Sequence, residues 1–309
     1  MDYQVAIHTY GRHELIADRA LATLEALEVD RDKITVFVPN QEQLYDYKAE
    51  LGNKWRLVIS SPGQFRCRQF YHLWFAEKYG ENQKLIQVDD DISPFKYLVP
   101  DDSKMNGYAL ARYEGTLDSL AEIGYGVAES VGTRLWGMSY RNNEFYMSDT
   151  VTVGNLLVMG RFQGAYAGDS IYLGSDRTYL ESQEEDAETS LRAFSKYGKV
   201  VRLNFISSVE KIGLKSPGGI RGEQMGKGLA EDIKEAWAIR EMTNRAAFET
   251  IYASFPGLVK IVENTDSKVT GIPRRSFRYK NMGNITIPRK VVEAQFGKLV
   301  KANLPFQQG

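Results

Sequence analysis

The chain has 309 residues, of which 43% are hydrophobic and 12% aromatic, so it can bury a substantial core in one large domain or two. Its first residues carry no signal segment, and no stretch approaches eighteen uninterrupted apolar residues, which predicts a cytosolic protein with no membrane partner. The formal net charge of −1 predicts no polyanionic partner by itself, while one cysteine and three histidines exclude an intramolecular disulfide and a common structural zinc site.

The first ninety residues alternate strands with helices. Apolar runs predict strands at residues 3–9, 34–38, 55–59 and 85–89, and helical spacing of apolar residues predicts a helix between each pair. This alternation implies right-handed crossovers and a mainly parallel sheet with helices on both faces. The carboxyl ends of the first and fourth strands should therefore lie on the same rim of an α/β domain.

After residue 91 the pattern changes. We expect a loop through Pro94 and Pro100, then a helix between residues 113 and 130, and then a hairpin-like pair of strands at 135–140 and 150–159. Ser182-Gln183-Glu184-Glu185 reads as a capping box that opens a helix to about residue 197, before one more strand at 199–206.

The last hundred residues differ in composition from the rest. A glycine-rich stretch at 209–228 is predicted to be a mobile loop, followed by a long helix to about residue 254 and a basic segment. We therefore expect a catalytic domain at 1–208, this loop, and a helical and basic C-terminal extension at 229–309 that packs on the domain.

Three consecutive carboxylates, Asp89, Asp90 and Asp91, follow the fourth strand directly. Ligands of open α/β sheets bind beyond the carboxyl ends of the strands, so these side chains should face a site. Hard divalent cations such as Mg²⁺ and Mn²⁺ prefer oxygen ligands and carry phosphates with them, which predicts a metal at Asp89 and Asp91. The alternative is an acidic surface turn, because aspartate is a common turn residue.

A parallel N-terminal half, an acidic triplet after its fourth strand and a mixed second half resemble the GT-A glycosyltransferases, which bind a nucleotide sugar through an Asp-x-Asp motif and a metal. The resemblance covers residues 1–208 and implies a GT-A-like fold. It implies that Asp91 is the main metal ligand and that Asp89 binds the ribose or the metal. The donor is expected to be UDP-linked, and the other residues that the resemblance places around it are Thr9, Tyr10, Arg12, Arg68 and Asp90.

A second acidic cluster spans residues 184–188 at the start of the predicted helix. Acids in a first helical turn complement the helix dipole, and Glu185 already belongs to the predicted capping box. Inverting GT-A enzymes carry an acidic pair at such a place, and the resemblance implies that Asp186 is the general base that deprotonates the acceptor hydroxyl. The histidine that often completes the metal shell in this group is missing, because no histidine follows His72.

The basic segment suggests an acceptor. Residues 268–301 hold nine basic residues and one acid, a net charge of +8 that leaves −9 for the rest of the chain. Together with His8-Thr9-Tyr10-Gly11-Arg12 and Pro217-Gly218-Gly219, this segment resembles phage glycosyltransferases of the TET/JBP-associated type, which act on hydroxymethylated bases in DNA. The resemblance implies a 5-hydroxymethylpyrimidine acceptor in DNA and phosphate contacts from four cations: Arg274, Arg275, Arg278 and Lys280.

Other readings stay open at this point. The acceptor could be a carbohydrate or a protein, and the basic segment could be a solvated surface. Asp89 and Asp91 after an apolar strand also approximate the motif of haloacid-dehalogenase phosphatases, with Asp89 as nucleophile, although that motif normally ends the first strand of its fold. Phe277 and Tyr279 could stack on a displaced base or could pack the segment onto the core.

Overall fold

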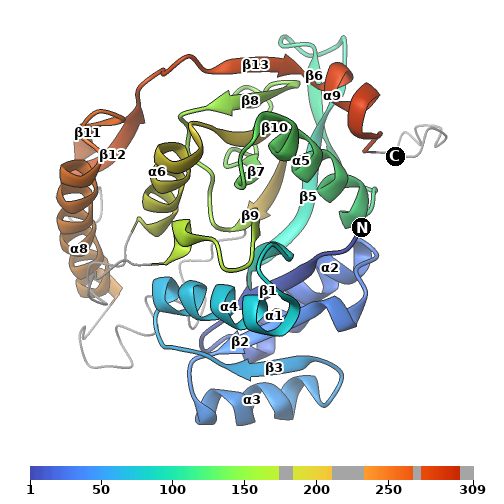
Figure 1. Ribbon diagram of the computed structural model, residues 1–309, viewed down its shortest axis with the longest axis vertical. Coiled ribbons are helices and arrows are strands. Elements are labelled where there is room, and N and C mark those ends of the chain that lie inside the picture. The colour runs from blue at the N-terminus through green and yellow to red at the C-terminus, as the bar shows by residue number, and fades with distance from the viewer. Residues whose placement is uncertain (174–183, 211–232, 267–272, 300–309) are drawn as a thin grey trace.

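The computed structural model describes residues 1–173, 184–210, 233–266 and 273–299 (Figure 1). Its N-terminal half confirms the predicted alternation. The strands are β1 (Gln4–His8), β2 (Ile34–Val38), β3 (Arg56–Ile59) and β4 (Lys84–Asp89), all parallel. The helices are α1 (His13–Ile16), α2 (Ala22–Ala26), α3 (Gln41–Leu51) and α4 (Gln64–Tyr79), with a π-helical turn at Ala17–Leu21 and a 3-10 turn at Arg31–Lys33.

The second half is mixed. Its strands are β5 (Ile92–Pro100), β6 (Tyr108–Arg112), β7 (Trp136–Ser139), β8 (Thr150–Gly154), β9 (Phe162–Tyr166) and β10 (Val200–Glu210). Its helices are α5 (Leu117–Val131), a 3-10 turn at Ser170–Tyr172 and α6 (Glu185–Tyr197). With β13 (Ile285–Pro288) from the C-terminal part, these strands form one large sheet in the order β13-β8-β10-β7-β9-β4-β1-β2-β3, and the β5–β6 hairpin pairs with β10. Because β9 is antiparallel to both β4 and β7, the parallel and mixed halves meet there.

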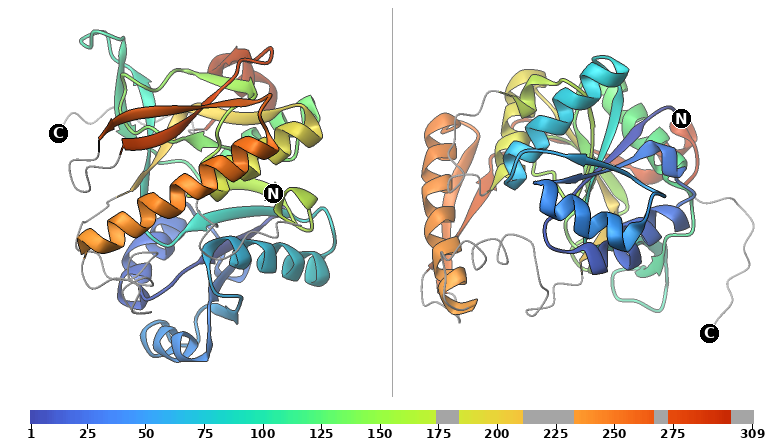
Figure 2. Two further views of the ribbon diagram at one scale, coloured as in Figure 1. Left: turned by 90° about the vertical axis from the view of Figure 1, so that its left-hand side faces the viewer. Right: turned by 90° about the horizontal axis from the view of Figure 1, so that it is seen from below.

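The C-terminal part contains α8 (Ile233–Ser254), β11 (Val259–Asp266), β12 (Pro273–Tyr279), β13 (Ile285–Pro288) and α9 (Arg289–Phe296). α8 lies beside the β11–β12 ribbon (Figure 2), while β13 extends the main sheet by pairing with β8. The expected helical extension thus also contains three strands. Neither α8 nor another helix in the described ranges combines the length and the apolar character needed to cross a membrane.

Two expectations for the second half are wrong. The stretch through Pro94 and Pro100 is the β5–β6 hairpin, not a loop. Pro94 is tolerated because β5 has one residue more than β10 where their register shifts, opposite Ser207 to Val209, so the missing N–H falls in a bulge of β5. Pro100 stands at the end of β5, where no further pairing with β10 is required.

The expected hairpin of 135–140 with 150–159 is also wrong, because β10 lies between β7 and β8. The strand stops at Gly154 instead of residue 159. Gly154 has a φ of 154°, and a Cβ there would lie 2.1 Å from Oδ1 of Asn284. That oxygen accepts the N–H of Asn155 at 2.9 Å, so a side chain replaces the next ladder bond. Residues 155–161 leave the sheet and form a loop that reaches the site.

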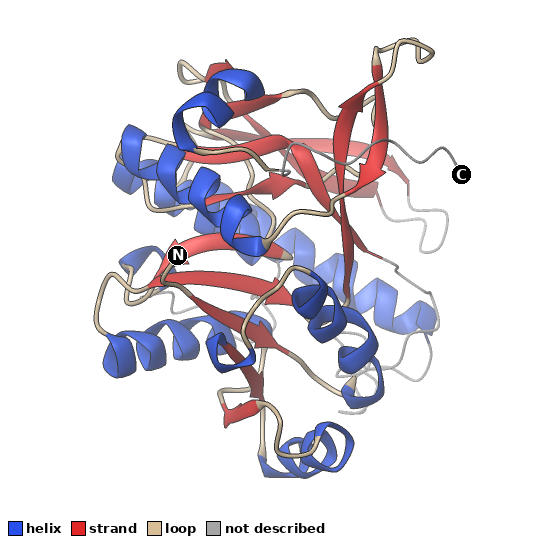
Figure 3. Cartoon of the chain, turned by 90° about the vertical axis from the view of Figure 1, so that its right-hand side faces the viewer, coloured by secondary structure: helices blue, strands red, loops and turns tan. Residues whose placement is uncertain are grey.

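The parallel strands β1, β2 and β4 are buried on both faces, as expected for a sheet with helices on each side, whereas β3 at the edge is only half-buried (Figure 3). Val5 and Ile7 belong to the same apolar cluster as the side chains of α1, α2 and α5. Ala6 points to the opposite face and packs with Phe75 and other side chains of α4. This packing fixes α4 under the carboxyl end of β4, which determines where its polar side chains reach the rim. The predicted α/β class, with a mixed sheet and helices on both faces, is confirmed.

Candidate functional site

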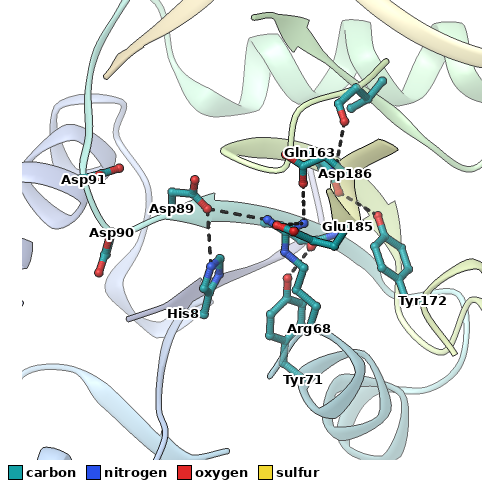
Figure 4. Close-up of polar contacts among 12 residues, drawn as sticks. His8, Arg68, Tyr71, Asp89, Asp90, Asp91, Gln163, Tyr172, Glu185 and Asp186 are labelled. Atoms are coloured by element: carbon teal, nitrogen blue, oxygen red, sulfur yellow. Dashed lines mark hydrogen bonds and ion pairs between the residues drawn. The ribbon is translucent and has the colours of Figure 1, made fainter. Parts of the chain in front are cut away.

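The acidic triplet lies at the predicted rim, and its three carboxylates differ in their surroundings. Asp89 is the last residue of β4, while Asp90 and Asp91 form the turn into β5. Asp90 is 5% exposed, whereas the side chains of Asp89 and Asp91 retain about a quarter of their exposed surface, 23% and 24%. In Figure 4 the carboxylate of Asp90 points away from that of Asp89.

Asp90 holds the loop after β1 against the turn after β4. Its Oδ2 accepts from Oγ1 of Thr9 at 2.6 Å, and its Oδ1 accepts from Nη1 of Arg12 at 2.6 Å. The same Nη1 donates to Oδ2 of Asp91 at 2.8 Å. Thr9, Arg12 and Asp90, which the sequence placed around the donor, therefore bond one another on the rim. Tyr10 lies between them in sequence, half-buried.

Asp89 has a different environment. It is paired in register with His8 of β1, whose Nε2 lies 3.6 Å from Oδ1 of Asp89. Oδ1 is enclosed and receives no hydrogen bond within the described residues. Burial raises the pKa of Asp89 well above its ordinary value, against the opposing effect of Arg68. Burial, with the charges of Arg68 and Arg12, lowers the pKa of His8 to about 3, so this imidazole is neutral. An enclosed carboxylate oxygen without a donor is a position for a cation.

Arg68 connects the triplet with the second acidic cluster. It comes from α4, is 2% exposed, and lies among three carboxylates (Figure 4). Nη1 lies 2.6 Å from Oδ1 of Asp186 and 3.5 Å from Oε1 of Glu185, and Nη2 lies 3.9 Å from Oδ1 of Asp89. The resemblance placed Arg68 around the nucleotide donor, which stays a prediction. In the structure its guanidinium joins Asp89 of β4 to the start of α6.

The start of α6 departs from the predicted capping box. The helix begins at Glu185, its N-cap is Glu184 with a φ of 61°, and the side chain of Glu184 makes no capping hydrogen bond. Ser182 lies outside the described residues. Glu185 is therefore free of the predicted capping role and faces Arg68, and burial together with the charge of Asp186 raises its pKa to about 7. A carboxylate with a pKa near neutrality can accept and release protons at working pH.

The loop at 155–161 packs directly on the Arg68–Asp186 ion pair. A Cβ on Gly160 would lie 2.0 Å from Nη2 of Arg68 and 2.1 Å from Oδ1 of Asp186. Only glycine fits against the pair as it stands, because contacts this short do not occur between non-bonded atoms. Gly160 carried no sequence signal for a role in the site. Two other residues of the site had been noted without this role: Glu185 was assigned to the capping box within the acidic cluster, and His8 was part of the motif at the end of the first strand.

Two of the four predicted DNA-binding cations have intramolecular partners within the ranges that the structure describes. Arg275 pairs with Glu249 of α8 and, at 3.2 Å, with Glu263 of β11. Nζ of Lys280 donates to the backbone oxygen of Pro256 at 3.0 Å. Arg278 is exposed on β12, and the side chain of Arg274 lies outside the described residues. Arg275 and Lys280 therefore bind groups of the C-terminal part and not the carboxylates of the site. A role of the four cations in DNA binding stays a prediction.

The aromatic residues of the same segment pack inward. Phe277 and Tyr279 lie against a small apolar core formed by Leu191, Ile251 and Val259. The ring centroids of Phe248 and Phe277 are 4.5 Å apart. This arrangement agrees with the packing reading of the two aromatic residues rather than with stacking on a displaced base.

The carboxylates of the site do not form a closed metal cage. In the described ranges, no three histidine, cysteine, aspartate or glutamate side chains converge closely enough to hold a metal ion by themselves. A cation at Asp89 would need further oxygen ligands from water or from a phosphate, as is usual for Mg²⁺.

No protein-family model matches the chain, and neither does any curated protein. Its structure is similar to glucosyl-3-phosphoglycerate synthase from Mycobacterium tuberculosis in complex with Mn²⁺ and UDP, with a TM-score of 0.46 and 12% identity over 94% of this chain and 91% of that one. It is also similar to TarS 1-349 from S. aureus in complex with UDP-GlcNAc, with a TM-score of 0.42 and 14% identity over 82% and 75% of the two chains.

A third similar structure is the mannosyltransferase PcManGT from Pyrobaculum calidifontis in complex with GDP-Man and Mn²⁺. Its TM-score is 0.43, with 14% identity over 82% of this chain and 74% of that one. At such low identity and TM-score, the function of this chain rests on the residues of its own site.

Proposed function

We propose that the protein is a metal-dependent glycosyltransferase that moves a sugar from a nucleotide donor, UDP-linked, to a hydroxyl acceptor. One observation carries this proposal. The enclosed Oδ1 of Asp89, at the carboxyl end of a parallel strand, has no hydrogen-bond donor and is joined through Arg68 to the acidic pair Glu185–Asp186. A cation position and a candidate base thus share one rim of the sheet, as sugar transfer from a diphosphate requires.

The residues present fit a Mg²⁺ or Mn²⁺ ion. Asp89 and Asp91 would hold it, because both keep exposed carboxylate surface on the rim. When bound, the ion would neutralise the charge that develops on the departing diphosphate. Asp90 would not bind it, since Thr9 and Arg12 already occupy its two oxygens. Its role is to hold the β1 and β4 loops together.

Asp186 is the proposed general base. Its carboxylate would take the proton of the acceptor hydroxyl while the acceptor oxygen bonds the anomeric carbon and the bond from that carbon to the diphosphate breaks. Direct displacement of this kind inverts the anomeric centre. Asp186 is preferred to Glu185 because its side chain is more exposed, 18% against 9%. Arg68 would orient Asp186 through the hydrogen bond that its Nη1 donates to Oδ1.

The donor is tested by incubating the protein with individual nucleotide sugars and Mg²⁺ or Mn²⁺, and following release of the nucleoside diphosphate. Slow hydrolysis of at least one UDP sugar is expected, and it should stop in excess chelator. Absence of hydrolysis and of UDP binding across the whole series would overturn the proposal.

The proposed acceptor is a 5-hydroxymethylpyrimidine in DNA, and the proposed location of the protein is the cytosol. The internal ion pairs of Arg275 leave Arg278 as the exposed candidate for a phosphate contact. Duplex binding should weaken steeply with salt, and Arg278→Ala should lower the log–log slope by about 1. Arg275→Ala should leave the slope unchanged. Salt-independent binding would favour a carbohydrate or protein acceptor instead.

The phosphatase alternative is less well supported. Asp89 ends the fourth parallel strand of the sheet, with β1, β2 and β3 before it. The nucleophile of haloacid-dehalogenase phosphatases would be expected at the end of the first strand. Release of inorganic phosphate from a simple phosphate ester, with no activity on nucleotide sugars, would reverse this preference.

A further inference from the structure

Arg202 is a cation near the site that has no carboxylate partner among the described residues. It lies on β10, between β7 and β8. Its Nε donates to Oδ1 of Asn204 at 2.9 Å, and its Nη1 donates to the backbone oxygen of Leu157 at 3.2 Å. Burial lowers the pKa of Arg202, which is partly buried, whereas the charges of surrounding acids raise the pKa of the fully buried Arg68. A cation held mostly away from water without a counter-charge is costly unless a ligand supplies the anion.

Two tyrosines accompany this cation. The guanidinium carbon of Arg202 lies 5.3 Å from the ring centroid of Tyr140. The hydroxyl of Tyr279 is enclosed and has no hydrogen-bond partner in the described part of the chain. Burial raises the pKa of Tyr279, and so do the charges of Glu184 and Asp186, while Arg202 opposes them. Tyr279 is therefore a neutral hydrogen-bond donor under the electrostatic influence of Arg202 and of the acids of α6, and no described residue supplies an acceptor for it.

One peptide group connects Arg202 to the start of α6. The carbonyl of Leu157 accepts from Arg202, and the N–H of the next residue, Val158, donates to Oγ of Ser190 at 3.0 Å. The same Oγ donates to the backbone oxygen of Asp186 at 2.8 Å. Arg202 and Ser190 of α6 thus bond to opposite sides of the peptide between Leu157 and Val158, which connects the cation to the helix that carries the proposed base.

We propose that Arg202, Tyr279 and Tyr140 form a subsite for an oxyanion of the acceptor, a phosphate or a carboxylate, which positions the acceptor hydroxyl against Asp186. The guanidinium supplies the charge, the phenol of Tyr279 supplies a second donor, and Tyr140 covers the cation. This deepens the proposed function and rests on it for the identity of the reaction, whereas the binding of an anion does not depend on it.

The subsite is tested with inorganic phosphate, by thermal unfolding of protein saturated with UDP and Mg²⁺ so that the donor position is filled. We expect a saturable rise in Tm that equal ionic strength of potassium chloride does not reproduce. Arg202→Gln should abolish the rise, and Tyr279→Phe should weaken phosphate binding severalfold. Arg275→Gln is the matched control, because its cation is already paired with two glutamates, and it should respond like the unaltered protein.

Arg202→Lys keeps the charge and loses the planar fork, so it should bind phosphate with reduced affinity even if the glutamine variant folds poorly. UDP binding is measured separately by calorimetry. If the unaltered protein does not bind UDP, the proposed function is refuted. The phosphate titration would still test the subsite in that case. An unaltered phosphate response in Arg202→Gln, or no response beyond that to chloride, would overturn the inference.

Competition against inorganic phosphate identifies the source of the anion. Glycerol phosphate represents a small phosphorylated acceptor, glycerate represents a carboxylate acceptor, and a short oligonucleotide with a hydroxymethylated base represents the nucleic-acid backbone. At least one of them should displace phosphate from the unaltered protein and fail to bind Arg202→Gln. Failure of all three to compete would contradict a role for this subsite in acceptor binding.

Discussion

Nη1 of Arg68 lies 2.6 Å from Oδ1 of Asp186, although 118 residues separate the two in the chain. Arg68 comes from α4, which packs under β4, and Asp186 comes from the first turn of α6. The same guanidinium approaches Asp89 and Glu185. The cation position of the acidic triplet and the proposed base are therefore coupled through a single buried positive charge.

Gly160 is expected to be essential to this contact. Gly160→Ala would place a methyl group about where Arg68 and Asp186 meet, and separating a buried ion pair by overpacking should cost about 1–3 kcal/mol. Sugar transfer should fall more than donor binding, because the base is displaced while the acidic triplet is not. Chemical denaturation and steady-state kinetics measure the two effects. Gly257→Ala is the control, since no atom lies within 4 Å of its added Cβ. Equal behaviour of the two variants would show that the loop moves aside without consequence.

Asp90 and Asp91 should respond differently to the same substitution. Asp91→Asn is expected to remove metal-dependent turnover and leave stability nearly unchanged, because its side chain lies partly exposed on the rim. Asp90→Asn should lower stability by about 1–3 kcal/mol, because the buried carboxylate accepts from both Thr9 and Arg12. Thermal unfolding and diphosphate release in each variant make the comparison. Full activity of Asp91→Asn in excess chelator would remove that residue from the metal site.

The acidic pair at the start of α6 allows a direct comparison of two carboxylates. Asp186→Asn should preserve binding of the UDP sugar and lower the transfer rate by roughly 10²-fold or more, the usual scale of general-base catalysis. Glu185→Gln should lower it less. Single-turnover rates with saturating donor separate binding from chemistry. A larger loss in Glu185→Gln would transfer the role of base to Glu185, and a change in stability alone in both variants would exclude the pair from catalysis.

Glu185 also predicts a pH dependence of stability. Because burial and the charge of Asp186 raise its pKa to about 7 in the folded protein, against the opposing effect of Arg68, the folded state retains this proton after the unfolded chain has released it. The tighter binding of this proton stabilises the folded state. The stabilisation is complete below the ordinary glutamate pKa of about 4.3 and is lost as the pH rises to about 7. The neighbouring Glu184 acts in the same direction.

The measurement is the difference in Tm between Glu185→Gln and the unaltered protein. This difference should become more favourable to the variant as the pH rises from about 4.5 to 7, and should be constant above that window. Comparing two proteins at each pH removes the contributions of other groups with raised pKa values, such as Asp89. A difference independent of pH would show that Glu185 titrates normally.

Local patterns were sufficient for the N-terminal half. Apolar runs and the spacing of apolar side chains predicted four strands and their helices, and the shared rim of His8 and Asp89 followed from the handedness of parallel crossovers. The acidic triplet could be placed at that rim for the same reason. The second half was predicted less well, because antiparallel strands pair across long sequence distances. The insertion of β10 between β7 and β8 leaves no signal in either strand.

The α/β class and the acidic side chains at the end of the fourth strand could be predicted from the residues alone, since strand and helix periodicity and strand-end position are local properties. Which charges meet could not be predicted, because it depends on how distant elements pack. Asp90 bonds Thr9 and Arg12 instead of facing the site, Glu185 faces Arg68 instead of capping its helix, and Arg275 pairs with glutamates of α8 and β11. These partners are chosen by packing between elements far apart in the chain, and in a buried site the energy of a charge depends on what surrounds it more than on its own identity.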